Sequence, residues 1–439
     1  MKKSTLIVLA VAIALGAFVY FYDSKHNPKP ASTEEPSKAA FSVKPAEISS
    51  LTIHQAGGIV SLSKKGSQWD LTQPVETLAD QSAISGLVSD LTSLRIQRSF
   101  APTDNLSKYG LADPNVKLEF QETNGSSHNI QFGDADFSNT AVYALIDGSK
   151  EIDMLPTSLL DDSEKPVSQL RDRSLIDLKG SQVAALTLKD ASGDLTLTKG
   201  PAGWEITSPR KTLADSGAVD SLVSSLSNNK FTDVVSETPV DLAKYGLQHP
   251  AVALDLTTQD GKQFHLLLSK KDTNYYGRDP ARPMIFRLDA PAYQAFDKRF
   301  FDLRDKSILQ FDPTAVATVT LQNANGTVEC SQGKDDQWSV VEPFADKGKQ
   351  VQSWKILDPL QNIRATQIYD APSAAILAHL KKPAIQVTLT DKSNKTTTVQ
   401  ISAASGNSVY IRTSAGPEVY EAATQILTDL GFKVSDLLI

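Results

Sequence analysis

Hydrophobic and polar residues alternate along three stretches of the chain that lie at nearly equal distances from one another. The stretches begin at Ile48, Val183 and Val316, so their starts are 135 and 133 residues apart. Alternation with a period of two indicates a β-strand with one buried face and one solvated face. The pattern predicts one structural unit that occurs three times in tandem.

A tryptophan followed by a proline five residues later marks the same place in each copy. The segments are 69–74, 204–209 and 338–343, and their tryptophans lie 135 and 134 residues apart. A large aromatic residue that recurs on a strand is typical of a core anchor. We therefore interpret Trp69, Trp204 and Trp338 as structural residues, with a stacking platform for sugar or nucleotide as the alternative.

An acidic residue opens a helix-like segment after each proline. Asp80, Asp215 and Asp346 are candidate N-caps, because a carboxylate accepts hydrogen bonds from the free backbone N–H groups of a first turn. Apolar residues follow at helical spacing, which predicts one packed helix per copy. They are Ala83, Leu87, Leu91 and Leu94; Val219, Leu222, Val223 and Leu226; and Val351, Trp354, Leu357 and Leu360.

A turn and three further strands complete each copy. The sequence Lys-Tyr-Gly-Leu leads to Pro114 and Pro250 and degenerates to 380–383 in the third copy. Two alternating strands follow each proline. We place a third strand at 142–145, 285–288 and 409–412, and then a closing helix centred on Leu159, Phe296 and Ile426.

The resulting order in each copy is β-β-β-α-β-β-β-α. The connections between strands are too short for parallel crossovers, so the sheets must be mainly antiparallel. We predict an α+β fold of three tandem repeats in which antiparallel sheets are packed with helices. We call 41–173 repeat 1, 174–306 repeat 2 and 307–439 repeat 3.

The first 40 residues have a different composition. Residues 5–22 carry no charge, and a helix of that length spans about 27 Å, close to the hydrocarbon core of a bilayer. Lys2 and Lys3 precede this run, which by the positive-inside rule leaves the N-terminus in the cytoplasm. We predict a single transmembrane helix at 1–23 in the inner membrane, with a cleaved signal peptide as the alternative.

Residues 24–40 contain three prolines and no large apolar residue, which indicates a flexible linker. The remaining chain would then lie in the periplasm or outside the cell.

Charge and motif content argue against several functions. The chain has 44 basic and 51 acidic residues, a balance too acidic for a nucleic-acid binder. Cys330 is the single cysteine, which excludes an intramolecular disulfide and a cysteine-based metal cluster. The six histidines are scattered without ligand spacing, so we expect no metal site. No nucleotide, cofactor or nucleophile motif occurs, and we predict no cofactor, no catalytic residues and no enzymatic activity.

The second copy differs from the others in spacing. The distance from the tryptophan to the aromatic residue of the predicted third strand is 74, 82 and 72 residues in the three copies. We therefore place an insertion at 270–283. This expected loop carries Tyr275, Tyr276, Arg278 and Arg282, which are residue types enriched at interfaces. It is our candidate partner-binding loop, and a tolerated surface insertion is the alternative.

With its anchor, its polar tether and its tandem Trp-to-Pro and Lys-Tyr-Gly-Leu motifs, the chain resembles the bacterial family that carries domain of unknown function 4340. The segments at 204–209 and 244–247 match that pattern best, and the resemblance covers the chain after about residue 45. Proteins of this kind are often encoded beside an ABC-type exporter and a gliding-motility-like auxiliary protein. The resemblance implies an accessory role outside the membrane and supplies no catalytic residues.

These patterns lead to one expected function and two alternatives. We expect a membrane-anchored extracytoplasmic scaffold that binds a protein partner, as an accessory factor of an ABC-type transporter or another envelope complex. The first alternative is a module that binds an envelope polymer or a small ligand in grooves of the repeats. The second is an enzyme whose active site is assembled from distant positions and so leaves no local motif.

Overall fold

The computed structural model describes residues 37–439 except 103–104, 179 and 239–240. The predicted transmembrane helix at 1–23 therefore lies outside the described residues, as does most of the predicted linker. Among the residues described, no helix is long and apolar enough to cross a membrane. Strand β1 (Lys38–Ala39) already pairs with β6 (Arg95–Ile96), so folded structure begins inside the predicted linker, before residue 41.

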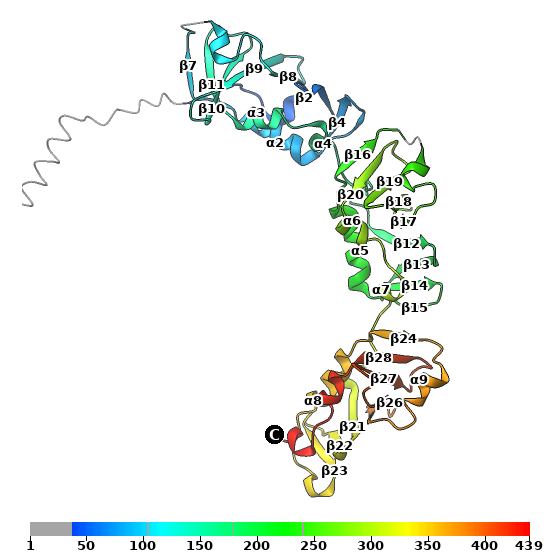
Figure 1. Ribbon diagram of the computed structural model, residues 1–439. Coiled ribbons are helices and arrows are strands. Elements are labelled where there is room, and N and C mark those ends of the chain that lie inside the picture. Colours follow the sequence, from blue (N-terminus) through cyan, green and yellow to red (C-terminus); the bar gives the residue numbers. More distant parts are fainter. Residues whose placement is uncertain (1–36, 103–104, 179, 239–240) are drawn as a thin grey trace, which may run out of the picture. The chain divides into compact units, whose positions relative to one another are not determined.

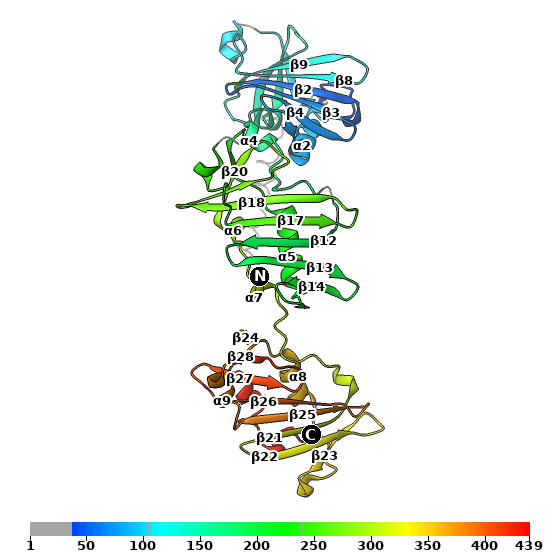
Figure 2. The same cartoon turned by 90° about the vertical axis from the view of Figure 1, so that its right-hand side faces the viewer.

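Three large antiparallel sheets follow one another along the chain (Figures 1 and 2), which confirms an α+β fold of tandem repeats. The strand orders are β5-β4-β3-β2-β8-β9-β10-β11-β7, β15-β14-β13-β12-β17-β18-β19-β20-β16 and β23-β22-β21-β25-β26-β27-β28-β24. The first two orders are the same, and the third lacks one edge strand. The chain divides into two compact units, one ending at Arg173 and one comprising Ser174–Ile439.

Repeat 1 consists of a strand meander, a long helix, a second meander and two short helices. Its remaining strands are β2 (Ile48–Gln55), β3 (Gly58–Lys65), β4 (Gln68–Gln73), β5 (Thr77–Leu78), β7 (Arg98–Phe100), β8 (Val116–Glu122), β9 (Ser127–Ala135), β10 (Ala141–Ile146) and β11 (Ile152–Pro156). Its helices are η1 (Pro45–Glu47), α2 (Gln81–Thr92), η2 (Leu106–Tyr109), α3 (Ser158–Ser163) and α4 (Val167–Leu170). As predicted, Asp80 caps α2 by accepting hydrogen bonds from the backbone N–H groups of Ser82 and Ala83.

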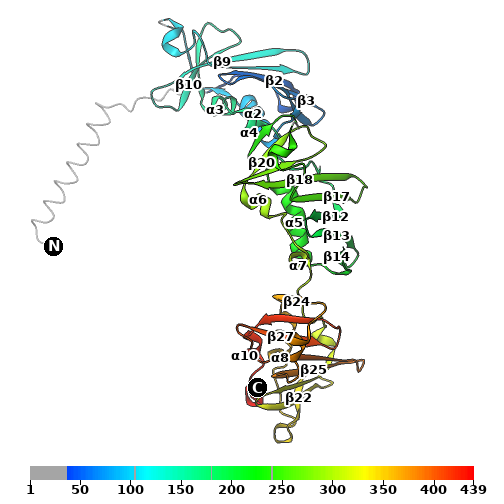
Figure 3. The same cartoon turned by 45° about the vertical axis from the view of Figure 1, so that its right-hand side comes forward.

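Repeat 2 has the same plan. Its strands are β12 (Val183–Asp190), β13 (Gly193–Gly200), β14 (Gly203–Ser208), β15 (Thr212–Leu213), β16 (Asp233–Ser236), β17 (Val252–Thr258), β18 (Gln263–Lys271), β19 (Asn274–Arg278) and β20 (Ile285–Leu288). Its helices are α5 (Ser216–Asn228), η3 (Leu242–Tyr245), α6 (Ala290–Gln294) and α7 (Phe300–Leu303). Asp215 caps α5 through the backbone N–H of Ala218, and Figure 3 shows α5, α6 and α7 on one side of the sheet.

Repeat 3 departs from the prediction at its long helix. Asp346 is not the cap of α8 (Trp354–Asn362) and lies instead in η5 (Phe344–Asp346). Ile356, Leu357 and Leu360 face the core, whereas Trp354 is 55% exposed. The apolar spacing from Val351 therefore predicted the wrong helix start.

The remaining elements of repeat 3 resemble those of the first two repeats. The strands are β21 (Val316–Asn323), β22 (Gly326–Gln332), β23 (Trp338–Glu342), β24 (Gln367–Tyr369), β25 (Ile385–Asp391), β26 (Thr396–Ile401), β27 (Ser408–Thr413) and β28 (Val419–Ala423). The other helices are η4 (Pro313–Ala315), α9 (Ala374–Ala378), α10 (Gln425–Asp429) and α11 (Val434–Leu437).

The structure adds strands to the predicted order in three places. A two-residue strand (β5 or β15) precedes the long helix in repeats 1 and 2, and a short edge strand (β7, β16 or β24) follows the long helix in every repeat. The second meander has four strands rather than three. In repeat 2 the predicted third strand at 285–288 is the fourth strand, β20, which is the counterpart of β11 and β28. The true third strand, β19, lies inside the segment that we expected to be an inserted loop.

The three tryptophans lie in three separate hydrophobic cores, formed within 41–170, 175–303 and 308–437. Trp69, Trp204 and Trp338 are 5%, 2% and 9% exposed, which confirms their structural role. The proline that ends each motif follows a cis peptide bond. Trp204 also donates a hydrogen bond from Nε1 to Oδ1 of Asp220 at 2.9 Å.

Within the second compact unit, an ion-pair cluster joins repeats 2 and 3. Arg304 is 5% exposed, and its Nη1 lies 2.7 Å from Oδ1 of Asp370. Arg210 Nη2 reaches the same oxygen at 2.7 Å and Oε1 of Glu418 at 3.3 Å. Because a buried guanidinium without a counter-charge is costly, Asp370 is the residue that makes the burial of Arg304 tolerable.

Candidate interaction surface

The predicted partner-binding loop is a β-strand followed by a turn, and its residues do not form one patch. Tyr275 and Tyr276 are neighbours on β19, so their side chains point to opposite faces of the sheet. Tyr275 lies 4.7 Å from the ring of Tyr293 on the helix side, whereas Tyr276 lies 5.2 Å from the ring of Tyr245. The strand thus separates two residues that the sequence places side by side.

The two arginines of the predicted site differ in their surroundings. Arg282 donates from Nη2 to the backbone oxygen of Ser174 at 2.8 Å and to that of Leu175, and its Nε pairs with Asp279 at 3.1 Å. Its role in the fold is thus to hold the first residues of repeat 2. Arg278 is half-buried, and its Nε is buried without a hydrogen bond to any residue that the structure describes.

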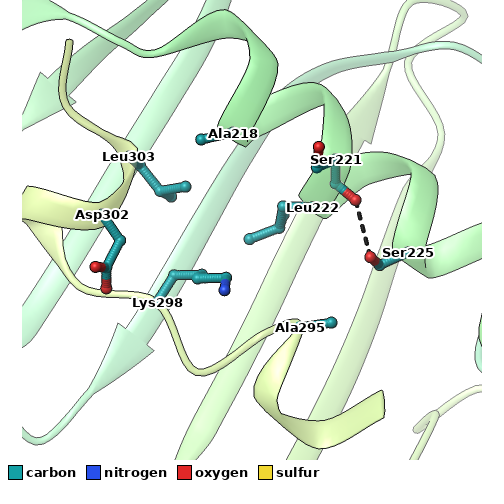
Figure 4. A pocket seen from close by; sticks show the side chains of 8 residues that line it. All are labelled: Ala218, Ser221, Leu222, Ser225, Ala295, Lys298, Asp302 and Leu303. Carbon is teal, nitrogen blue, oxygen red and sulfur yellow. Dashed lines mark hydrogen bonds between the residues drawn. The ribbon is translucent and has the colours of Figure 1, made fainter. Parts of the chain in front are cut away.

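Repeat 2 has a hollow between α5 and the segment after α6 (Figure 4). It has a volume of about 310 Å³. Its lining residues come from α5 on one wall and from 295–303 on the other; they are Ala218, Ser221, Leu222, Ser225, Ala295, Lys298, Asp302 and Leu303.

The polar side chains of this hollow differ in whether they have hydrogen-bond partners. The Ser225 hydroxyl donates to the backbone oxygen of Ser221 at 2.8 Å, and Asp302 accepts from the backbone N–H of Arg299 at 2.7 Å. Lys298 is half-buried, and its ammonium has no hydrogen bond or ion pair with any described residue. Figure 4 shows that this ammonium points across the hollow, away from Asp302.

The first repeat contains a larger hollow of about 650 Å³. Gln55, Asn115 and Glu164 supply polar groups to it, and Val116 and Val167 supply apolar surface. At the corresponding turn of repeat 2, Asp190 instead forms an ion pair with Arg299. The space in repeat 1 thus lies where repeat 2 places a charged contact.

His128 in repeat 1 lies between two carboxylates. Its Nδ1 is 2.8 Å from Asp147 and its Nε2 is 3.0 Å from Glu122, while its ring stacks on Phe120 at 4.9 Å. Burial alone would lower the pKa of His128, but the hydrogen bonds to Asp147 and Glu122 outweigh it and raise the pKa above its usual value. His128 thus has a structural role, in which its protonated ring forms ion pairs with Asp147 and Glu122.

Other candidate chemical groups are structural or isolated in the described residues. Cys330 is buried on β22, where burial raises the pKa of its thiol to about 11, so it is an inert strand residue. No cluster of three or more His, Cys, Asp or Glu side chains that could hold a metal ion occurs in this part of the chain. Burial also raises the pKa of Asp153, whose carboxylate accepts a hydrogen bond from Ser99 at 2.6 Å.

Two large aromatic side chains of repeat 3 are exposed. Phe344 follows the proline of the tryptophan motif and is 81% exposed, and Trp354 in the first turn of α8 is 55% exposed. The residues that follow the corresponding prolines in the first two repeats are Val75 and Arg210. The sequence patterns indicate neither residue, because the helical spacing places Trp354 on the buried face and Phe344 belongs to no repeated motif.

Comparison with known families identifies the family of the chain but no activity. The family model described as "Domain of unknown function (DUF4340)" matches residues 69–205 and 204–379. The chain belongs to this family, because the two matches together cover most of its length. Each match begins at a tryptophan of the repeated motif, so both extend across a boundary between repeats. The search of curated proteins finds no match.

Proposed function

We propose that this family member is a membrane-anchored extracytoplasmic scaffold that binds a protein partner in the cell envelope, as an accessory factor of an ABC-type transporter or a related complex. The observation that carries the proposal is the exposure of Phe344 and Trp354 on repeat 3. Burying such a side chain contributes roughly 1.5–3 kcal/mol. Large aromatic residues are enriched at the centres of protein interfaces.

The location rests on the N-terminal sequence. Residues 5–22 are uncharged and follow two lysines, which favours an inner-membrane helix with a cytoplasmic N-terminus. A C-terminal alkaline phosphatase fusion should be active, since the repeats would lie outside the cytoplasm. Deleting 5–22 should release the protein from the membrane fraction. An inactive fusion that is stably expressed would contradict the proposed orientation.

Partner binding is tested by purifying the tagged full-length chain from native membranes in mild detergent. We expect transporter subunits to co-elute in a fixed ratio with the unmodified chain. Fewer of them should co-elute with the double variant that combines Phe344→Ser and Trp354→Ser. Phe137→Ser is the matched control, because Phe137 is fully exposed on repeat 1. Recovery of the unmodified chain alone, from membranes that contain the transporter, would overturn the proposal.

A second candidate function is the binding of an envelope polymer or a small ligand. The 650 Å³ hollow of repeat 1 favours it, because carboxamide and carboxylate groups converge there beside apolar surface. Its test is the binding of cell-wall fragments to the unmodified chain and to Asn115→Ala by calorimetry. Absent heat of binding for the unmodified chain would remove this candidate, and equal heats for both proteins would show that the fragments bind outside this hollow.

A further inference from the structure

Each repeat ends in a short helix, and the closing segment that leads into this helix carries a different residue at one equivalent position in each repeat. Leu170, Leu303 and Leu437 each end the last short helix of a repeat and are fully buried. The residues five positions earlier are therefore equivalent, and they are Lys165, Lys298 and Phe432. The three repeats place an ion-paired lysine, an unpaired lysine and a phenyl ring at this point.

Repeat 1 shows which group pairs with the lysine. Lys165 Nζ lies 2.5 Å from Oδ1 of Asp162. The Asp162 carboxylate lies over Gly86 of α2, because a Cβ added to that glycine would come within 4.0 Å of Oδ2. In repeat 1, Asp162 of α3 thus places a carboxylate in the space between α2 and α3.

Repeat 3 fills the same place with apolar side-chain atoms. Phe432 is partly buried and packs against the hydrophobic core of its repeat. Neither repeat 1 nor repeat 3 therefore leaves an unpaired charge at this position.

Repeat 2 keeps the lysine but has lost the acid. The position of Asp162 is taken by Ala295, and that of Gly86 by Ser221. Ala295 and Ser221 both line the 310 Å³ hollow into which Lys298 points (Figure 4). The hollow is the space that a carboxylate side chain fills in repeat 1.

We propose that the hollow formed by Lys298, Ala295 and Ser221 binds an Asp or Glu side chain of the partner protein. The lysine supplies the counter-charge, the Ser221 hydroxyl can donate to the second carboxylate oxygen, and the Leu222 side chain shields the pair from water on one side. This site deepens the proposed function and rests on it, since it names the chemistry of the group that the partner presents.

A zero-length carbodiimide cross-linker tests the site, because it joins a lysine amine to a carboxylate only when the two are in contact. Native membranes that contain the full-length chain are treated with the reagent, and linked peptides are identified by mass spectrometry. We expect Lys298 to be linked to an Asp or Glu of another protein. Ala295→Asp should abolish this link, because the introduced carboxylate pairs with Lys298 as Asp162 pairs with Lys165, whereas the small, uncharged Ala295→Ser should retain it.

The outcomes separate this inference from the proposed function. Links to a partner through other lysines but never through Lys298 would overturn the carboxylate site and leave the scaffold function standing. A Lys298 link that persists at full yield in Ala295→Asp would also overturn the site. If no lysine of the chain is linked to another protein, the proposed function fails and the carboxylate site fails with it.

Discussion

Repeats 1 and 2 have the same strand order and the same type of helix cap, but they differ at their closing segments. Asp80 and Asp215 both cap the long helix, and Trp69 and Trp204 both lie in the core. The charge of Lys165 is neutralised by Asp162 within repeat 1, whereas Lys298 has no ion pair with any described residue of repeat 2. The comparison shows that the repeats share the residues that build the fold and differ in those that face solvent, where a contact with another molecule can be acquired.

Removing the shared tryptophan should have the largest effect. We expect Trp69→Ala and Trp204→Ala each to lower the free energy of unfolding of its own repeat by about 3–5 kcal/mol, because each deletes a buried indole and leaves a cavity. Hydrogen exchange of the full-length chain in detergent, resolved by peptide, measures each repeat separately. If one variant destabilises and the other does not, the two cores are not equivalent.

The helix caps test the comparison at a smaller scale. Asp80→Ala and Asp215→Ala should each cost about 1 kcal/mol, because backbone N–H groups of the first turn lose their acceptor. Ser353→Ala is the control, since the Ser353 side chain makes no capping hydrogen bond to α8. Urea unfolding followed by hydrogen exchange measures the effect, and a Ser353→Ala loss as large as the others would contradict the assignment of the caps.

Much of the fold could be predicted because its signals are local. The period-two strands, the tryptophan motif and the caps of α2 and α5 each depend on residues within one turn or one hairpin. Strand β19 was missed because Asn274, Gly277 and Pro280 suggest a loop by composition. Gly277 is required by packing instead, since a Cβ there would lie 2.3 Å from the Phe286 ring.

The candidate surface was harder to predict because it depends on contacts between distant segments. Tyr275 and Tyr276 could form one patch on a loop, but on strand β19 they face opposite sides of the sheet. Nothing in the sequence marks Phe344 or Trp354 as exposed, because Phe344 lies outside the repeated motifs and the apolar spacing favours burial of Trp354. The one available signal for the hollow was the register between Lys165 and Lys298 when the repeats are aligned on Leu170 and Leu303.

The pH dependence of stability should distinguish repeat 1 from repeat 2. The pKa of His128 is raised above its usual 6.5 in the folded state, so its stabilising contribution is fully present below about pH 6.5 and is lost as the pH rises through the raised value. Phe264 occupies the equivalent place in repeat 2 and does not titrate. Between pH 5.5 and 9, the protection of repeat 1 should fall towards that of His128→Gln, and a constant difference between the two proteins would contradict this contribution.

Exchanging the charges of the two closing segments should have the smallest effect on stability. Asp162→Ala should cost repeat 1 about 0.2–1 kcal/mol, because a partly exposed ion pair contributes little. Ala295→Asp should stabilise repeat 2 by a similar amount, and both effects should shrink in 1 M salt, where the Debye length is about 3 Å. Thermal unfolding of both variants at low and high salt measures this. A stabilisation by Ala295→Asp that vanishes in salt would mean that repeat 2 forgoes an available internal ion pair, and that its unpaired lysine serves a contact outside its own chain.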